Sequence, residues 1–246
     1  MKLRTSAATA LAATAAVLAM GAAPAMAATT HTAATLKPTT LSLSANVTWA
    51  KYGQWATLTA HLGPTAANRT VEIDGAGWGA GSWVLKKANV DRNGNLVAYA
   101  KMSRNTTFTA KFAGDSKDAA ASAKRVVYSS AGVTSRMFGY YGTSGAYHLY
   151  HYNTLAGNKG KPVFGGQVLQ NKGGESVNLT WQVYYHGAWR TANSGGFQLD
   201  KQYSAFSVWF QDVPQFKGLN ERVSFSYAGD GVNTGANSGW SYFRVS

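Results

Sequence analysis

Many short segments of the chain alternate between apolar and polar residues with a period of two, which is the pattern of half-buried β-strands. In residues 55–62, every second side chain from Ala56 to Leu62 is apolar. Residues 177–185 alternate in the same way, with large apolar side chains at the odd positions. Gly-Pro, Asn-Gly and Ala-Gly-Asp sequences separate such segments, and these residues favour turns. The pattern predicts an all-β protein without helices.

One segment of this pattern occurs twice. Residues 108–115 are FTAKFAGD, and residues 223–230 are VSFSYAGD. In each copy the alternating segment runs into an Ala-Gly-Asp corner, and a last strand is predicted further on, at 125–128 in the first copy and at 240–245 in the second. The duplication indicates that one structural unit has been used twice, with a boundary near residues 129–132.

About seven short strands at roughly 8–12-residue spacing are predicted in the first unit, which is typical of a β-sandwich. These strands are expected at 41–44, 55–62, 71–74, 83–85, 96–100, 108–112 and 125–128. A glycine-rich turn is predicted at 75–81 and an Asn-Gly hairpin turn at 91–95. Corresponding strands of the second unit are expected at 161–164, 177–185, from 189, at 206–210, at 223–227 and at 240–245.

The order of these features carries a resemblance to a known family. Trp83, the turn DRNGN at 91–95 and the segment NTTFTAKFAGD at 105–115 follow one another as in bacterial immunoglobulin-like repeats of secreted and surface proteins. The resemblance covers about residues 39–129, whereas over 140–246 only Trp189 and YAGD at 227–230 match. It implies two tandem immunoglobulin-like antiparallel β-sandwiches, at 39–129 and 130–246, which act as spacers or binding modules without catalysis. Because this fold hosts many functions, it implies no specific ligand.

The first 27 residues have the features of a secretory signal peptide. They contain a basic start with Lys2 and Arg4, an alanine-rich apolar run at 7–23, and a small-x-small cleavage pattern at 25–27. Residues 28–38 are predicted to be a flexible lead-in. A membrane-spanning segment at the N-terminus is the alternative, and no later segment approaches the roughly 20 apolar residues that a span needs. The expected localisation is extracellular, free or associated with a cell surface.

The charge of the chain bears on the class of partner that it could bind, and its cysteine content bears on how it is stabilised. Removal of the 27 residues leaves 21 basic and 10 acidic residues, a formal charge of +11. Such a balance favours polyanionic partners such as cell-wall polymers, although solubility alone is an alternative explanation. There is no cysteine, so neither a disulfide nor a lipid-attachment cysteine exists and stability must come from packing.

Two acidic motifs invite a functional interpretation. Asp115 and Asp230 occupy equivalent corners, but they belong to separate repeats, and an aspartate after a glycine most often caps the backbone N–H groups of its own turn. Residues 91–95 place oxygen donors at alternate positions, as a calcium loop does. The later acidic ligand is missing, so a hairpin turn is favoured.

Other catalytic or metal motifs are weaker still. His148 and His151 are three residues apart, which places them on opposite faces of a strand and does not favour a shared metal ion. The sequence contains no nucleophile elbow, zinc-protease motif or phosphate loop, and its acidic residues offer no obvious pair for glycoside hydrolysis. We therefore expect no enzyme activity, no cofactor and no metal site.

Aromatic residues are concentrated in the second unit, with 9 in 29–129 and 22 in 130–246. The alternation places Tyr184 and Trp209 on the polar faces of their strands, and exposed rings beside Asn and Gln can stack on sugars or contact a protein. Tyr184, Trp189 and Trp209 are thus the predicted ligand-binding residues, and a tyrosine-rich, glycine-rich stretch could add to this surface, with tyrosines at 140, 141, 147, 150 and 152. Burial of both faces of the sheet, which would hide these rings, is the alternative.

The predicted function is binding of cell-envelope glycan or another polyanion, and the rival is a protein-interaction module such as a secreted inhibitor or adhesin.

Overall fold

The computed structural model describes residues 35–152, 160–211 and 213–246, so the expected signal peptide at 1–27 lies outside the described residues. In these ranges the chain forms 18 β-strands and one short 3₁₀ turn, Pro214–Phe216. The all-β prediction is confirmed. Within the same ranges, no helix is long and apolar enough to cross a membrane.

Residues 41–129 form two sheets, which we call the N-terminal sheet pair. The first is antiparallel, with the order β1-β3-β6; its strands are β1 (Leu41–Ala45), β3 (Trp55–Leu62) and β6 (Asn95–Lys101). The second has the order β2-β8-β7-β4-β5; its strands are β2 (Trp49–Ala50), β8 (Ala121–Ser129), β7 (Thr106–Phe112), β4 (Thr70–Gly77) and β5 (Ser82–Asn89). The short β2, which the sequence did not predict, pairs in parallel with the end of β8.

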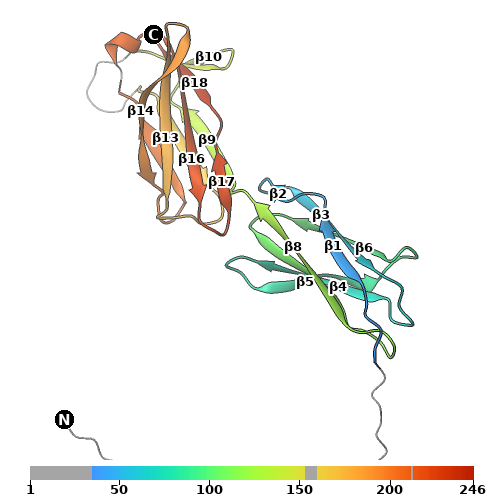
Figure 1. Ribbon diagram of the computed structural model, residues 1–246. Coiled ribbons are helices and arrows are strands. Elements are labelled where there is room, and N and C mark those ends of the chain that lie inside the picture. Colours follow the sequence, from blue (N-terminus) through green and yellow to red (C-terminus); the bar gives the residue numbers. More distant parts are fainter. Residues whose placement is uncertain (1–34, 153–159, 212) are drawn as a thin grey trace, which may run out of the picture. The chain divides into compact units, whose positions relative to one another are not determined.

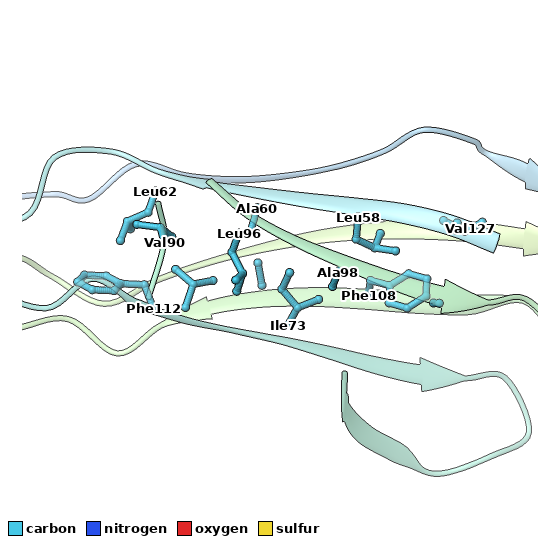
Figure 2. Close-up of a cluster of buried hydrophobic side chains, with 14 of the residues drawn as sticks. Leu58, Ala60, Leu62, Ile73, Val90, Leu96, Ala98, Phe108, Phe112 and Val127 are labelled. Carbon is cyan, nitrogen blue, oxygen red and sulfur yellow. The ribbon is translucent and has the colours of Figure 1, made fainter. Parts of the chain in front are cut away.

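A single hydrophobic core joins these two sheets (Figure 2). Leu58 of β3 and Ile73 of β4 are fully buried, as are Phe108 and Phe112 of the duplicated segment in β7. Along β3 the even positions from 56 to 62 are buried, as the alternation predicts. Burial of these apolar faces against each other is the main force that holds the sheets together.

Residues 133–245 form the C-terminal sheet pair. Its smaller sheet is antiparallel, with the order β15-β12-β9; the strands are β9 (Val133–Phe138), β12 (Val163–Val168) and β15 (Ala205–Trp209). Its larger sheet has the order β10-β11-β18-β16-β13-β14, with β17 beside β16 (Figure 1). The strands of the larger sheet are β10 (Gly142–Ser144), β11 (Tyr147–Tyr150), β13 (Ser176–Tyr185), β14 (Ala188–Gln198), β16 (Asn220–Gly229), β17 (Thr234–Asn237) and β18 (Ser241–Val245).

A second, aromatic-rich core lies between these sheets. Phe164 of β12, Phe225 of β16 and Phe243 of β18 are almost completely buried. Tyr150 also belongs to this core, with 1% of its surface exposed. The expectation that Tyr150 would add to a surface is therefore wrong. Its hydroxyl donates a hydrogen bond to the carbonyl oxygen of Phe138 at 2.7 Å, and burial raises the pKa of this hydroxyl above its usual value.

The glycine-rich segment at 75–81 differs from the prediction. Gly75 to Gly77 are not in a turn but form the end of β4, and the turn itself starts at Trp78. A Cβ atom at Gly75 would lie 2.5 Å from the indole of Trp83. Here glycine serves close packing: the ring of Trp83 on β5 lies directly against the backbone of β4.

The predicted hairpin at 91–95 is confirmed. Gly94 has a φ of +82°, its N–H donates to the carbonyl oxygen of Asp91 at 2.9 Å, and its own carbonyl oxygen accepts from the N–H of Leu62 at 2.8 Å. At the start of the domain, Lys37 pairs with Asp118 in an isolated bridge. Backbone hydrogen bonds to a distant part of the chain thus begin at Lys37, within the segment 28–38 that was predicted to be a flexible lead-in, whereas the first strand begins at Leu41.

Candidate functional site

The side of the larger C-terminal sheet that faces away from the core, here called the outer face, carries the candidate site. Alternate residues of β13 and β16 point to the core, and the residues between them point outward. Strand pairing places Gln182 of β13 opposite Arg222 of β16, and Arg222 opposite Tyr242 of β18. Three neighbouring strands thus bring an amide, a guanidinium and a phenol into one row.

Arg222 is at the centre of this arrangement. The carbon of its guanidinium lies 4.2 Å from the ring centroid of Trp189 and 4.1 Å from that of Trp240. Its Nε donates to Oε1 of Gln182 at 2.9 Å, and Nη2 donates to the same oxygen at 2.6 Å. Two indole contacts and two hydrogen bonds fix the position and the plane of this cation.

Further aromatic rings extend the cluster over the outer face. Tyr184 packs on Trp189 with ring centroids 5.3 Å apart, and Trp189 lies 6.0 Å from Tyr242. Tyr242 in turn lies 5.6 Å from Tyr147 of β11. We call this group, together with Arg222, Trp240 and Arg244, the aromatic-arginine array. Its members come from β11, β13, β14, β16, β18 and the residue that precedes β18.

Arg244 repeats the arrangement of Arg222 on the next strand. Its guanidinium carbon lies 5.4 Å from the ring centroid of Tyr147. Its Nε donates to Oδ1 of Asn220 at 3.0 Å, and its Nη2 donates to the same oxygen. Both arginines are therefore oriented by the side-chain oxygen of a neutral amide that lies opposite on the neighbouring strand.

The outer face carries no carboxylate among the described residues of its strands. Register places on it the following polar side chains besides the array: Ser144, Ser176, Asn178, Thr180, Gln182, Thr191, Ser194, Gln198, Asn220, Ser224, Ser226 and Asn237. The nearest acidic residue in sequence, Glu221, points to the core, where it is 2% exposed and accepts a hydrogen bond from Nε1 of Trp181 at 2.8 Å. Within the described parts of the chain, the charges of Arg222 and Arg244 thus have no anionic partner on this face.

The structure confirms that the predicted residues Tyr184 and Trp209 are exposed, at 41% and 54%. Tyr184 and Trp189 lie together in the array. Trp209 does not join them, because it lies on β15 of the smaller sheet, opposite Val163 of β12. The ligand-binding role of all three residues remains a prediction.

Sequence reasoning missed the arginines and their amide partners. Arg222 directly precedes the duplicated segment at 223–230, and the alternation that puts Val223 and Phe225 in the core puts Arg222 on the outside. The alternation could therefore have predicted from the sequence that Arg222 points outward. Trp240 was assigned to the last strand, but it precedes β18, so the alternation could not place its ring.

A hollow of about 740 Å³ lies over β4, β5, β7 and β8 in the N-terminal sheet pair. Its charges are already paired. Lys87 lies 2.8 Å from Glu72, and Lys111 pairs with Asp74. Hydrogen bonding to these carboxylates, reinforced by their charge, raises the pKa of both lysines. These cross-strand pairs satisfy one another and leave little net charge for a ligand.

The side chains of the possible calcium loop at 91–95 and of His148 and His151 make contacts within the protein. Oδ1 of Asp91 accepts the N–H groups of Asn93 and Asn95 at 2.8 and 2.9 Å, which is a turn-capping role. His151 stacks on Tyr141 at 4.0 Å between centroids, while Nδ1 of His148 lies 3.2 Å from the carbonyl oxygen of Tyr242. The described residues include no group of three or more His, Cys, Asp or Glu side chains that could hold a metal ion.

Comparisons with known proteins identify no family. No family model matches the sequence, and no curated protein matches it. A DUF4785 family protein from Legionella pneumophila subsp. pneumophila str. Philadelphia 1 is similar in structure with a TM-score of 0.35 and 12% identity, over 76% of this chain and 51% of that one. The chain thus spans about half the length of that protein, and a TM-score of this size supports no inference about function.

Proposed function

We propose that this chain is a secreted, non-enzymatic protein of two tandem immunoglobulin-like β-sandwiches, residues 39–129 and 130–246, that binds cell-envelope glycan through the aromatic-arginine array. The observation that carries the proposal is the position of Arg222, between two indoles on a sheet face whose described strand residues include no carboxylate.

The chemistry of the outer face matches that of a sugar polymer. Aromatic rings offer apolar faces on which the C–H faces of sugars stack, and their polar atoms remain in contact with water. Beyond the array, β13, β14 and β16 present hydroxyl and amide side chains, such as Asn178, Thr180 and Ser224, which can exchange hydrogen bonds with sugar hydroxyls. A β-sheet face several strands wide suits an extended polymer that lies across it.

Charge supports an envelope location for this ligand. The chain from residue 28 carries a formal charge of +11, and envelope polymers are commonly anionic. Long-range attraction would raise the local concentration of such polymers and speed encounter. The aromatic rings then supply short-range contacts that charge alone does not provide.

Co-sedimentation of the purified protein with purified bacterial cell walls tests the proposal. Trp189→Ala should weaken wall binding about tenfold, because it removes a stacking surface and one of the two rings that hold Arg222. Trp55→Ala is the matched control: Trp55 is 59% exposed, but it lies on β3 of the N-terminal sheet pair. Equal loss of binding in both variants, or no binding by the unmodified protein, would contradict the proposal.

A protein-interaction module is the second candidate, and the edge strand β14 favours it. This strand has 11 residues and pairs only with β13 in the described part of the chain. Its free side could accept a strand of a partner protein by β-augmentation. Binding through backbone hydrogen bonds should change little with ionic strength, whereas binding of an anionic polymer should weaken steeply as salt increases.

A further inference from the structure

We propose that the ligand of the outer face is an acidic glycan, and that Arg222 and Arg244 bind its carboxylate or phosphate groups. This inference rests on the proposed function, since it specifies which glycans the aromatic-arginine array accepts. The basis of the inference is the set of hydrogen bonds and ring contacts that hold the two arginines in place. These contacts are a property of the site and are independent of the net charge of the chain.

Neutral groups orient both guanidinium groups. Arginines that are fixed on a sheet are commonly paired with carboxylates, which neutralise them. Here Gln182 accepts from Arg222 and Asn220 accepts from Arg244, so each cation keeps its full charge. In each arginine Nε and Nη2 make these bonds, while Nη1 has no hydrogen-bond partner among the described residues. That nitrogen can donate to a ligand without breaking an existing contact.

The two cations are also neighbours. Arg244 lies opposite Asn220, and Arg222 lies opposite Tyr242, on the adjacent antiparallel strands β16 and β18. The arginines are therefore diagonal partners, a relationship that places Cβ atoms about 7–8 Å apart or somewhat less. Their guanidinium groups are held by different amides, that of Arg222 by Gln182 on β13 and that of Arg244 by Asn220 on β16. Two anionic groups along one polymer could therefore each pair with one of the two arginines.

The surrounding rings explain why the anion would be part of a sugar. Trp189 and Trp240 both lie against the Arg222 guanidinium, and Tyr147 lies beside Arg244. These rings displace water from the guanidinium faces, which strengthens a charge-assisted hydrogen bond at the remaining nitrogen. The outward surfaces of Tyr184 and Trp189 lie next to this position and can stack on the ring that bears the acidic group.

Chemically altered cell walls test the inference. One sample is left intact, a second is treated with cold hydrofluoric acid to remove phosphodiesters, and in a third carbodiimide coupling converts carboxylates into neutral amides. We expect one of the two treatments to lower the affinity of the unmodified protein about tenfold, which identifies the anionic group. Arg222→Gln and Arg244→Gln should each lower the affinity for intact walls to a similar extent and should respond little to the same treatment.

Arg190→Gln is the matched control. Arg190 follows Trp189 on β14, alternates to the opposite side of the sheet, and lies opposite Val183, whose side chain is in the core. Arg190→Gln removes one positive charge from the same sheet but from its other side, and the wall affinity should remain within about twofold. A loss as large as that of Arg222→Gln would overturn the inference, because it would show that only net charge matters.

The wall treatments separate failure of this inference from failure of the proposed function. Binding that survives both treatments would overturn the acidic-glycan assignment and leave glycan binding in place. Absence of binding to intact walls would overturn both. Thermal melting of each variant shows whether it is folded, and the comparison of the three wall samples with the unmodified protein remains decisive if a variant is not.

Discussion

Asp115 and Asp230 occupy the same corner in the two copies of the duplicated segment, yet their second carboxylate oxygens bind different partners. In both, Oδ1 accepts two N–H groups of the following turn. Oδ2 of Asp115 accepts the N–H groups of Ala67 and Asn68, at 2.9 and 3.1 Å. Oδ2 of Asp230 instead pairs with Nζ of Lys172. The predicted turn-capping role is confirmed for both, and each carboxylate also ties its corner to a distant loop.

Asp115 should make the stability of the protein sensitive to acid. Hydrogen bonds from Lys117, Ala67 and Asn68 hold the pKa of this carboxyl well below its usual value of 3.8. As pH falls, the unfolded chain therefore takes up this proton before the folded chain does. The contribution of Asp115 is complete above pH 3.8 and is lost progressively below it, towards the folded-state pKa.

Asp115→Asn should lower the melting temperature at pH 7 and reduce its dependence on pH between pH 4 and pH 2. Ser116→Ala, in the same turn, is the control and should leave this dependence unchanged. Melting temperatures measured by circular dichroism across pH 2–7 provide the test. An equally steep decline with acid in Asp115→Asn would show that other groups cause it.

The ion pair of Lys172 and Asp230 should show strong energetic coupling. The side chain of Lys172 is only 4% exposed and that of Asp230 is 19% exposed. Burial opposes ionisation of Asp230, but the hydrogen bonds from Lys172, Asn233 and Val232 outweigh it and keep its pKa below the usual value. Loss of one partner leaves the other charge buried and uncompensated, which typically costs about 3 kcal/mol.

Urea unfolding of Lys172→Met, Asp230→Asn and the double variant measures this coupling. Each single change should lower the free energy of unfolding by about 3 kcal/mol. The double variant should lose at least about 1 kcal/mol less than the sum of the two, because it leaves no unpaired charge. Strict additivity would mean that the contact contributes nothing as a pair.

Gly94 should not tolerate a side chain. Its φ is +82°, and a Cβ atom there would lie 2.3 Å from the carbonyl oxygen of Leu62. Gly187, at the tip of the β13–β14 hairpin, has a φ of +77° but nothing within 4 Å of a Cβ atom. Gly94→Ala combines strain and collision and should cost more than about 2 kcal/mol, whereas Gly187→Ala should cost about 1 kcal/mol. Chemical unfolding of both variants separates the two effects, and equal losses would rule out the collision.

Local alternation predicted most of the longer strands and which side of each is buried, but it did not predict β2, β9, β10, β11 or β17. The even positions of β3 and the odd positions of β13 from 177 to 183 lie in the cores, as expected, because neighbouring residues of a strand point to opposite sides and only one side is apolar. Tyr185, at the end of β13, is exposed instead. The glycine content led to a wrong prediction for Gly75 to Gly77, which belong to β4 and not to a turn. Glycines there indicate a turn, but their actual role depends on Trp83, whose position follows from the pairing of β4 with β5.

The candidate site depends more on strand order than on local pattern. Exposure of Tyr184 and Trp209 followed from alternation alone. Their separation did not, because nothing local shows that β13 and β15 belong to different sheets. Arg222 likewise contacts two residues that are distant in sequence: Trp189 lies 33 positions before it and Trp240 lies 18 positions after it. Such contacts require the order β18-β16-β13-β14, which a single sequence does not reveal.

Gln182 should act as a positioning residue for the ligand. Its Oε1 receives both hydrogen bonds that fix the plane of Arg222. Gln182→Leu removes this acceptor but leaves the charge of Arg222 and the size of the side chain at position 182 nearly unchanged. We expect cell-wall affinity to fall roughly three- to tenfold, as for loss of a hydrogen bond to a charged group. The salt dependence of binding should stay the same, because no charge is removed.

Titration of cell-wall binding at several salt concentrations distinguishes this role from a charge effect. Arg222→Gln should reduce both the affinity and its salt dependence, whereas Gln182→Leu should reduce the affinity alone. Gln167→Leu is the control: Gln167 lies on β12 of the smaller sheet and donates to the carbonyl oxygen of Tyr203 at 3.0 Å. A flatter salt dependence in Gln182→Leu would show that the substitution displaces the cation itself, and unchanged affinity would show that the two indoles are enough to hold Arg222 in place.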